Sequence, residues 1–352
     1  MPDRLDDPAF VLRNDPKGMM GLTMGFPDQC RRGLSIATSA PLNDSLASCD
    51  QVVVAGVGGS AAGGDFLRAL FEAFSKTPCF VLRDYDLPAF VNERTLVIAC
   101  SYSGNTEETL TTTAQALGRG CKILAVTSGG ALVEIGAKKG FPVIKVPAGQ
   151  PPRTALGFLF VPPAVACVRL GFLPALEFEA AFEMLDSCVE RWGVQARANP
   201  AKVLAGKLFE TVPLIYGLGP WQGIVANRWK SQINENSKTM AFANTFPELN
   251  HNEIMGWSLA DRQGVSKWAT VILENGDESK RMQERSRVTQ EIFCGKGEAH
   301  VVRAEGSSLL TQMLTLTSFG DFVSLYMAAL YGIDPEAIDS INTLKKALSE
   351  LH

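Results

Sequence analysis

Two short turns rich in glycine and hydroxyl groups could hold a phosphate. The first, GVGGS at 56–60, follows an apolar run and opens a helical pattern, where free N–H groups and the helix dipole attract an anion. The second, SYSGNT at 101–106, follows another apolar run and offers three hydroxyls in six residues. Serine and threonine in such turns also cap helices. Two such turns together favour one phosphate site, whose predicted residues are Gly58, Gly59, Ser60, Ser101, Ser103 and Thr106.

The first turn also matches part of a dinucleotide-binding fingerprint. Gly56-x-Gly58 begins the pattern GxGxxG, and its sixth position is Ala61, which the motif tolerates. Asp84, after CFVLR, stands roughly where a ribose-binding carboxylate is expected. A dehydrogenase does not need the hydroxyl cluster at 101–106, whereas a terminal phosphate with several free oxygens does. We therefore favour a phosphate and keep a nucleotide-dependent oxidoreductase as an alternative.

The elements that must position these turns alternate between strand and helix. Apolar runs predict strands at Val52–Val57, Thr95–Cys100 and Lys122–Thr127. Helical patterns follow them at Ala61–Ser75, Thr106–Gly118 and Ala131–Lys139. This order predicts parallel strands joined by right-handed crossovers, which is a doubly wound α/β domain.

The same order returns in the second half of the chain. Strands are predicted at Pro213–Gly217, Ala269–Glu274 and Ala299–Ala304, with late helices at Leu309–Leu330 and about Ile338–Leu351. VVVAGVGGS resembles PLIYGLGP, and TLVIACSYSGN resembles ATVILENGD. The chain is therefore predicted to hold a duplicated domain, with limits of 1–168 and 181–352 and a connection near 170–181.

The two copies can be compared at the turn that follows the second predicted strand of each. Where the first copy has SYSGNTEET, the second has ENGDESK, with Glu274, Asp277 and Glu278. Carboxylates repel a phosphate dianion, whereas hydroxyls and backbone N–H groups bind it. If one half holds a phosphate, it is the first.

Charge and composition argue against several other classes of protein. Lys and Arg number 33 and Asp and Glu 37, giving a net charge of −4, which does not favour a nucleic-acid or membrane partner. The apolar run at 155–168 contains Pro162 and Pro163 and is too short to span a bilayer. The acidic start of the chain lacks the pattern of a secretory signal. We expect a cytoplasmic protein.

The cysteines and histidines do not form a metal-binding pattern. The eight cysteines are scattered without a CxxC pair and are predicted to be reduced, largely in the core. The only histidines are His251, His300 and His352, so a zinc site built on several histidines is not expected. We predict no metal.

Several motifs together resemble a known family. GVGGS and SYSGNTEET are similar to the sugar isomerase (SIS) domain, a flavodoxin-like fold that binds phosphosugars. PPRTALG at 151–157, QINENSK at 232–238 and FPELNHNEIMGW at 246–257 narrow the resemblance to the bifunctional phosphoglucose/phosphomannose isomerases of archaea and bacteria. The resemblance implies two SIS domains with doubly wound parallel sheets, a C-terminal helix, and cofactor-free isomerisation of a hexose 6-phosphate.

The resemblance also implies roles for four residues. Glu235 would carry a proton between C1 and C2 of the sugar, and burial can raise a carboxyl pKa toward such a task. His251, whose titration range suits ring opening, would reach the site of a neighbouring subunit, which implies a homodimer. Arg153 would stabilise the enediolate. Lys345 would assist ring opening, although Lys346 is adjacent and could take its place.

One departure bears on specificity. Related sequences tend to read Asp-Pro-Thr-Pro before that lysine, whereas this chain has Asp334, Pro335, Glu336 and Ala337. Activity on both glucose 6-phosphate and mannose 6-phosphate is therefore less firmly implied than isomerisation itself. A non-catalytic sugar-phosphate sensor and another SIS-type phosphosugar isomerase remain as alternatives.

Overall fold

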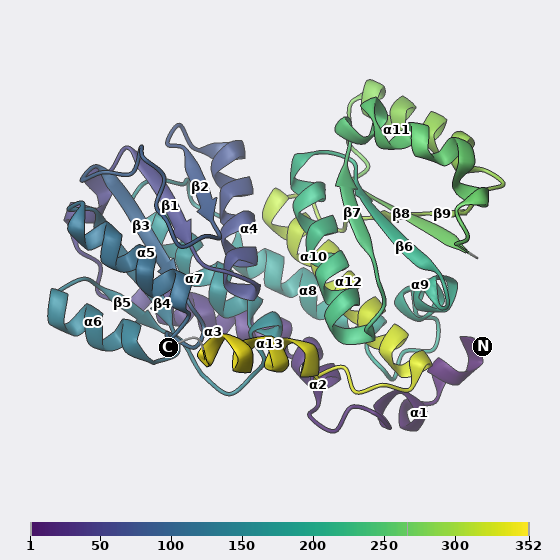
Figure 1. Cartoon of the computed structure of the whole chain (residues 1–352), viewed down its shortest axis with the longest axis horizontal. Helices are drawn as coiled ribbons and strands as arrows, with labels where there is room; N and C mark the ends of the chain where they lie inside the picture. Colours follow the sequence, from purple (N-terminus) through teal and green to yellow (C-terminus); the bar gives the residue numbers. More distant parts are fainter. Residues whose placement is uncertain (1, 266, 351–352) are drawn as a thin grey trace. The chain divides into compact units, whose positions relative to one another are not determined.

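The computed structural model describes residues 2–265 and 267–350, which divide into two compact units (Figure 1). One unit comprises residues 25–186 and 305–314 and holds sheet A. The other comprises the described residues of 1–24, 187–304 and 315–352 and holds sheet B. Two of the four boundaries fall within helices, α8 (Phe178–Trp192) and α12 (Leu309–Tyr331), and the other two follow residues 24 and 304. The domain limits of 1–168 and 181–352 remain a prediction.

Sheet A is a five-stranded parallel sheet in the order β2-β1-β3-β4-β5. Its strands are β1 (Gln51–Ala55), β2 (Cys79–Leu82), β3 (Thr95–Cys100), β4 (Lys122–Thr127) and β5 (Val143–Lys145). Val54 lies in register with Ile98, and Ile98 with Leu124. These central strands are almost wholly buried, which explains why their sequences are continuous apolar runs.

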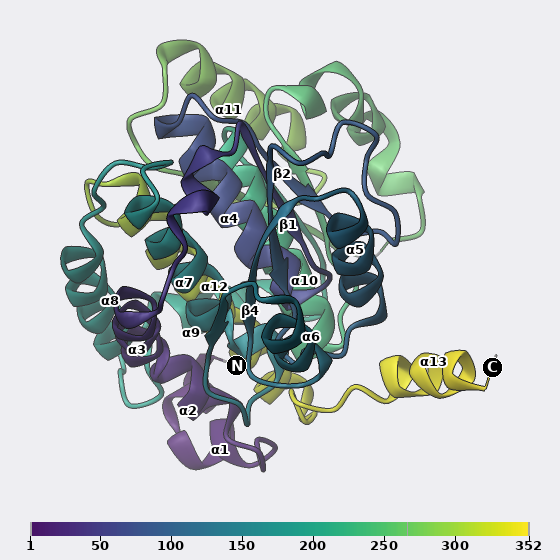
Figure 2. The ribbon, with the colours of Figure 1, turned by 90° about the vertical axis from the view of Figure 1, so that its left-hand side faces the viewer.

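Helices cover both faces of sheet A. Figure 2 shows α5 and α6 on one side of the strands and α4 and α7 on the other. The side chains of β1 alternate accordingly, because Val53 and Ala55 pack in the cluster with Ala116 of α5, whereas Val54 lies against Gly64 of α4. The helical elements of this unit are α3 (Phe26–Ser39), η2 (Asp44–Ser48), α4 (Gly59–Phe74), α5 (Glu107–Gly118), α6 (Ala131–Lys139), η3 (Pro152–Thr154) and α7 (Leu156–Arg169).

Helix α7 continues through two prolines. Pro162 and Pro163 interrupt the apolar pattern in the sequence, yet both lie inside the helix. Proline within a helix costs about 3 kcal/mol because it removes a hydrogen bond and crowds the preceding turn. Residues 156–167 are all buried, so packing of the helix offsets this cost.

Sheet B repeats the topology with one strand fewer. Its four parallel strands follow the order β7-β6-β8-β9, which matches β2-β1-β3-β4 of sheet A and supports the predicted duplication. The strands are β6 (Val212–Gly217), β7 (Phe242–Thr245), β8 (Trp268–Glu274) and β9 (Glu298–Arg303). The helical elements of this unit are η1 (Pro2–Asp6), α1 (Pro8–Leu12), α2 (Met19–Met24), α9 (Pro200–Leu208), α10 (Pro220–Ser237), η4 (Glu248–His251), η5 (Glu253–Arg262), α11 (Lys280–Phe293) and α13 (Asp339–Ser349).

An aromatic cluster forms the core on one face of sheet B. Tyr216 packs edge-on against Phe246 and close to Phe293, and Trp257 lies 4.1 Å from Phe293 between ring centroids. Leu249 joins the same cluster, so the 3₁₀ helices after β7 are anchored in the core.

Most predicted elements are confirmed, with shifts of one or two residues. The predicted strands at 95–100 and 122–127 have the observed bounds, whereas β1 ends at Ala55 and α4 begins at Gly59, two residues earlier than predicted in each case. The predicted burial of the cysteines is confirmed for seven of the eight free thiols, whereas Cys294 is exposed. By length and composition α12 could cross a membrane, but 94% of its apolar window is buried inside the protein, as in a core helix.

Candidate active site

The two predicted phosphate turns lie side by side in the sheet A unit. Strands β1 and β3 are neighbours, and β2 lies on the other side of β1. The strand order therefore reverses between β1 and β3, and ligands of doubly wound sheets bind outside the carboxyl ends of the strands at such a point. The turn after β1 opens α4, and the turn after β3 opens α5, so both helix N-termini face this region.

Hydroxyl groups hold these turns in shape. Ser60 Oγ accepts a hydrogen bond from the Tyr102 N–H at 3.2 Å, which joins the two turns. Ser101 Oγ lies 2.7 Å from Thr106 Oγ1 and accepts from the Gly104 N–H at 3.0 Å. Ser60 and Ser101 are buried, whereas Gly58 and Ser103 are exposed. The Ser60 hydroxyl still has a proton to donate, and so does one of the paired Ser101 and Thr106 hydroxyls, so these groups can shape the turns and also bind an anion.

Arg153 lies in the short 3₁₀ helix η3, whose backbone touches the first turn. A Cβ atom on Gly59 would lie 2.7 Å from the Pro152 carbonyl oxygen and 3.3 Å from the Arg153 nitrogen. Glycine at this position therefore permits the close approach of the two backbones. Arg153 is 5% exposed, which is low for a charged side chain. The structure thus brings the six predicted phosphate residues and Arg153 together in one unit.

Replacing Gly59 by Ala is expected to weaken phosphate binding by about tenfold, because the new methyl group pushes the turn away from the Pro152 carbonyl. Isothermal titration with inorganic phosphate or a hexose 6-phosphate measures the effect. Gly118→Ala is the matched control, since Gly118 ends α5 and has open space around its Cβ position. Equal affinities for the two variants would contradict the assignment of this turn.

The corresponding turn of sheet B is already filled by a carboxylate of the chain. Glu278 accepts hydrogen bonds from the N–H groups of Asn275 at 2.5 Å and Gly276 at 3.0 Å. Gln222, in the first turn of α10, donates a further bond to Glu278 at 3.2 Å. The N–H groups that an anion would need are therefore occupied by an internal negative charge. This supports the prediction that a phosphate belongs to the first copy.

Glu235 lies in the last turn of α10 and is partly buried. The neighbouring Asn236 donates a hydrogen bond to Ser324 Oγ of α12 at 2.9 Å. After the helix, Lys238 adopts a left-handed conformation, and its ammonium donates to the carbonyls of Glu235 at 2.7 Å, Asp334 at 3.0 Å and Pro335 at 3.1 Å. Lys238 therefore ties the end of the Glu235 helix to the loop that departs from the pattern of related sequences.

A buried polar network fixes α10 against α12. Arg228 pairs with Asp321 at 2.7 Å, and Gln232 donates to the same carboxylate at 2.9 Å. Burial raises the pKa of Asp321, although Arg228 and Gln232 act in the opposite direction. Arg228, Gln232 and Asn236 follow one another at intervals of four residues, so they share one face of α10. This face sets the rotation of the helix that carries Glu235.

His251 and Lys345 lie on two other segments of the sheet B unit. His251 ends η4, beyond the carboxyl end of β7, and its side chain is exposed. Lys345 lies in α13, where it is exposed together with the adjacent Lys346. Three predicted catalytic residues of this unit therefore lie on different elements: Glu235 at the end of α10, His251 in η4 and Lys345 in α13.

Sequence reasoning missed the residues that hold the His251 segment. Glu253 and Asn250 occur in the motif FPELNHNEIMGW, but their partners lie far away in the sequence.

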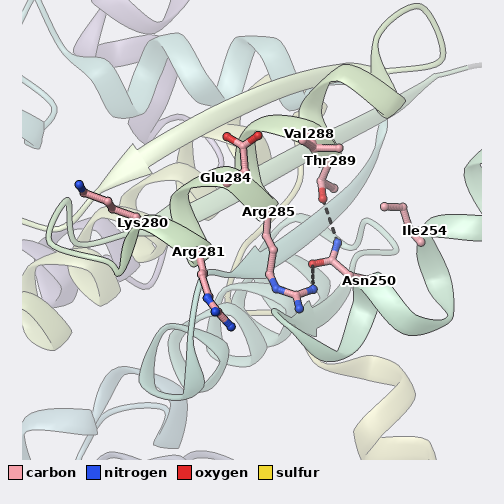
Figure 3. Close-up of a pocket in the computed structure, with 8 residues that line it drawn as sticks. All are labelled: Asn250, Ile254, Lys280, Arg281, Glu284, Arg285, Val288 and Thr289. Atoms are coloured by element: carbon pink, nitrogen blue, oxygen red, sulfur yellow. Dashed lines mark hydrogen bonds between the residues drawn. The ribbon is translucent and has the colours of Figure 1, made fainter.

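A surface hollow of about 550 Å³ adjoins this segment, between Asn250 and the basic start of α11 (Figure 3). Within residues 2–265 and 267–350, no three His, Cys, Asp or Glu side chains are grouped so that they could hold a metal ion.

Comparison with known proteins first defines the class. Residues 45–133 match the family model of the SIS domain, and residues 197–348 match that of the bacterial phospho-glucose isomerase C-terminal SIS domain. A solved structure of a hypothetical protein from Thermus thermophilus has the same fold, with a TM-score of 0.75 and 17% identity over 99% of this chain and 94% of that one. The chain is thus a SIS-domain protein of the phosphosugar isomerase fold.

Two curated relatives define the family. A bifunctional phosphoglucose/phosphomannose isomerase of Caldicellulosiruptor bescii is 40% identical over 93% of this chain and 97% of its own length. One of Thermoplasma acidophilum is 38% identical over 85% of this chain and 89% of its own. The chain belongs to the bifunctional phosphoglucose/phosphomannose isomerase family.

Proposed function

We propose that this enzyme interconverts glucose 6-phosphate, and also mannose 6-phosphate, with fructose 6-phosphate. The observation that carries the proposal is the pair of hydroxyl-rich turns joined by the Ser60–Tyr102 hydrogen bond, with Arg153 against them. The names of the curated relatives support the same substrates. A hexose 6-phosphate has the terminal phosphate that such turns can bind.

In this proposal Glu235 carries the proton. Its carboxylate removes the hydrogen from C2 of the open-chain aldose, and the electron pair of that bond forms a cis-enediol as the C1 carbonyl oxygen gains a proton. Return of the proton to C1 and loss of the C2 hydroxyl proton gives the ketose. Arg153 stabilises the negative charge that develops on the enediol oxygens. Either C2 epimer loses its stereochemistry at this intermediate, so one base can serve both aldoses when each binds with its C2 hydrogen towards that base.

His251 and Lys345 open the sugar ring in this scheme. Hexose 6-phosphates are mostly closed, so the ring oxygen must gain a proton and the C1 hydroxyl must lose one before C2 chemistry begins. A neutral imidazole can accept a proton and its conjugate acid can donate one near neutral pH. We also propose a cytoplasmic homodimer in which His251 serves the site of the neighbouring subunit.

A direct assay tests the proposal. Purified protein is incubated with glucose 6-phosphate or mannose 6-phosphate in deuterated water, with and without a chelator, and fructose 6-phosphate and C2 exchange are followed by NMR. We expect product and exchange from both sugars, unchanged by the chelator. Binding without exchange would identify a sugar-phosphate sensor instead. Loss of activity on chelation would contradict the metal-independent scheme, and NAD(P) protection in a thermal shift assay would favour an oxidoreductase.

A further inference from the structure

The segment Glu248–Glu253, which surrounds His251, is held by its own polar side chains. Asn252 Nδ2 donates to Glu248 Oε1 at 2.7 Å, and Asn252 Oδ1 accepts from the Glu253 N–H at 2.6 Å. Leu249, with 1% of its surface exposed, anchors the same segment in the aromatic core. In this segment of the described chain, His251 is the only polar side chain without a hydrogen-bonding partner.

Asn250 attaches the segment to α11. Its amide donates to Thr289 Oγ1 at 2.9 Å, and its carbonyl oxygen accepts from Arg285 Nη1 at 3.3 Å. Figure 3 shows Asn250 between these two side chains, both of which extend from the same helix. Thr289 is 1% exposed and Asn250 is partly buried, so the first of these bonds is partly shielded from water, which strengthens it.

Glu253 attaches the other end of the segment to sheet B. Its Oε1 accepts from the Tyr216 hydroxyl at 2.5 Å, and its Oε2 accepts from Asn244 Nδ2 at 2.5 Å. Tyr216 lies near the end of β6 with 1% of its surface exposed, and Asn244 lies near the end of β7. Burial and the adjacent carboxylate raise the pKa of Tyr216, which keeps its hydroxyl protonated as a donor. Both carboxylate oxygens are thus engaged by rigid strands.

The geometry points to Glu253 as a positioning residue that fixes the backbone of His251 against the ends of β6 and β7. The inference rests on the ring-opening role proposed for His251. An imidazole that transfers protons must be held within a fraction of an ångström of its target, and side chains that lock the supporting backbone provide this precision. Glu253 touches neither the sugar nor its reacting atoms in this scheme, and it acts only through His251.

A double-mutant cycle tests the inference. We expect Glu253→Ala to lower kcat/KM for closed-ring glucose 6-phosphate by between about tenfold and a hundredfold. In a His251→Ala background, the same change is expected to cost less than about twofold, because the positioned group is already gone. Exchange at C2 of an open-chain sugar-phosphate analogue should be nearly unaffected. An equal loss in both backgrounds, or an equal loss for ring and open-chain substrates, would overturn the inference.

Two conservative variants distinguish a loss of positioning from a folding defect. Tyr216→Phe keeps the ring in the core and removes one bond to Glu253, so it should show a smaller loss of the same kind. Glu253→Gln keeps an acceptor for Asn244 and should recover most of the ring-form activity. A Glu253→Gln variant that loses C2 exchange would instead indicate an acid or base role for Glu253, contrary to the inference. The exposed Glu134→Gln in α6 is the control for removal of a carboxylate elsewhere.

Hydrogen exchange separates this inference from the proposed role of His251. Glu253→Ala should increase amide exchange of residues 249–255, whereas His251→Ala should leave their protection unchanged. If His251→Ala does not reduce ring-form turnover, the ring-opening role fails. If amide protection survives in Glu253→Ala, the positioning role fails, whatever His251 does.

Discussion

Glu235→Gln is expected to reduce kcat by about a thousandfold, which is within the range that a positioned acid or base contributes. The amide cannot accept the C2 proton, so exchange of that hydrogen with solvent deuterium should stop. Binding of the hexose 6-phosphate should change little, because the proposed phosphate contacts belong to the turns at 56–60 and 101–106. NMR of the C2 hydrogen and isothermal titration measure the two effects.

The exposed Glu190→Gln in α8 is the matched control for loss of a carboxylate in the same unit. It should leave both exchange and binding unchanged. Near-normal turnover in Glu235→Gln would require another base. A parallel loss of binding would indicate that Glu235 contacts the ground-state substrate as strongly as the transition state.

Arg228→Met is expected to lower the free energy of unfolding by about 3 to 5 kcal/mol, because it leaves the buried Asp321 carboxylate without its cation. Urea unfolding followed by tryptophan fluorescence measures the loss. All five tryptophans lie in the sheet B unit, so this signal reports on the unit that contains the pair; they are Trp192, Trp221, Trp229, Trp257 and Trp268.

The double variant Arg228→Met with Asp321→Asn removes both charges and should lose less stability than Arg228→Met alone. Since burial already raises the pKa of Asp321, the folded state binds its proton more tightly than the unfolded state. Acid therefore favours folding at this site, and the loss in Arg228→Met should shrink as the pH is lowered from about 7 towards 5. A single variant as stable as the double would show that the unpaired Asp321 carboxylate is not the source of the loss.

The elements that could be predicted from sequence are those with strong local patterns. The strands at 95–100 and 122–127 are buried on both faces, so each is a continuous apolar run with clear ends. Strand β7 was not predicted, because FANT lies at the edge of sheet B, is partly exposed, and has no apolar periodicity. Strand β5 has only three residues and was missed for lack of length.

Only part of the candidate site could be predicted from local sequence. The glycine and serine turns could be predicted because their residues are adjacent in the sequence and follow recognisable strands. The contact between Gly59 and Pro152, and the bond between Tyr216 and Glu253 over 37 residues, depend on tertiary packing. No local pattern indicates such partners, so the sequence alone does not predict the structural roles of Asn250 and Glu253.

The Glu278 carboxylate, in the turn after β8, makes the two copies of the duplicated domain unequal. A gene duplication begins with two identical binding sites for the same ligand. Here, a carboxylate of the chain occupies the anion-binding N–H groups of one copy. In the proposed function, that copy supplies the reactive groups Glu235, His251 and Lys345, while the other copy binds the substrate phosphate. Saturation curves should therefore report a single binding event for each polypeptide.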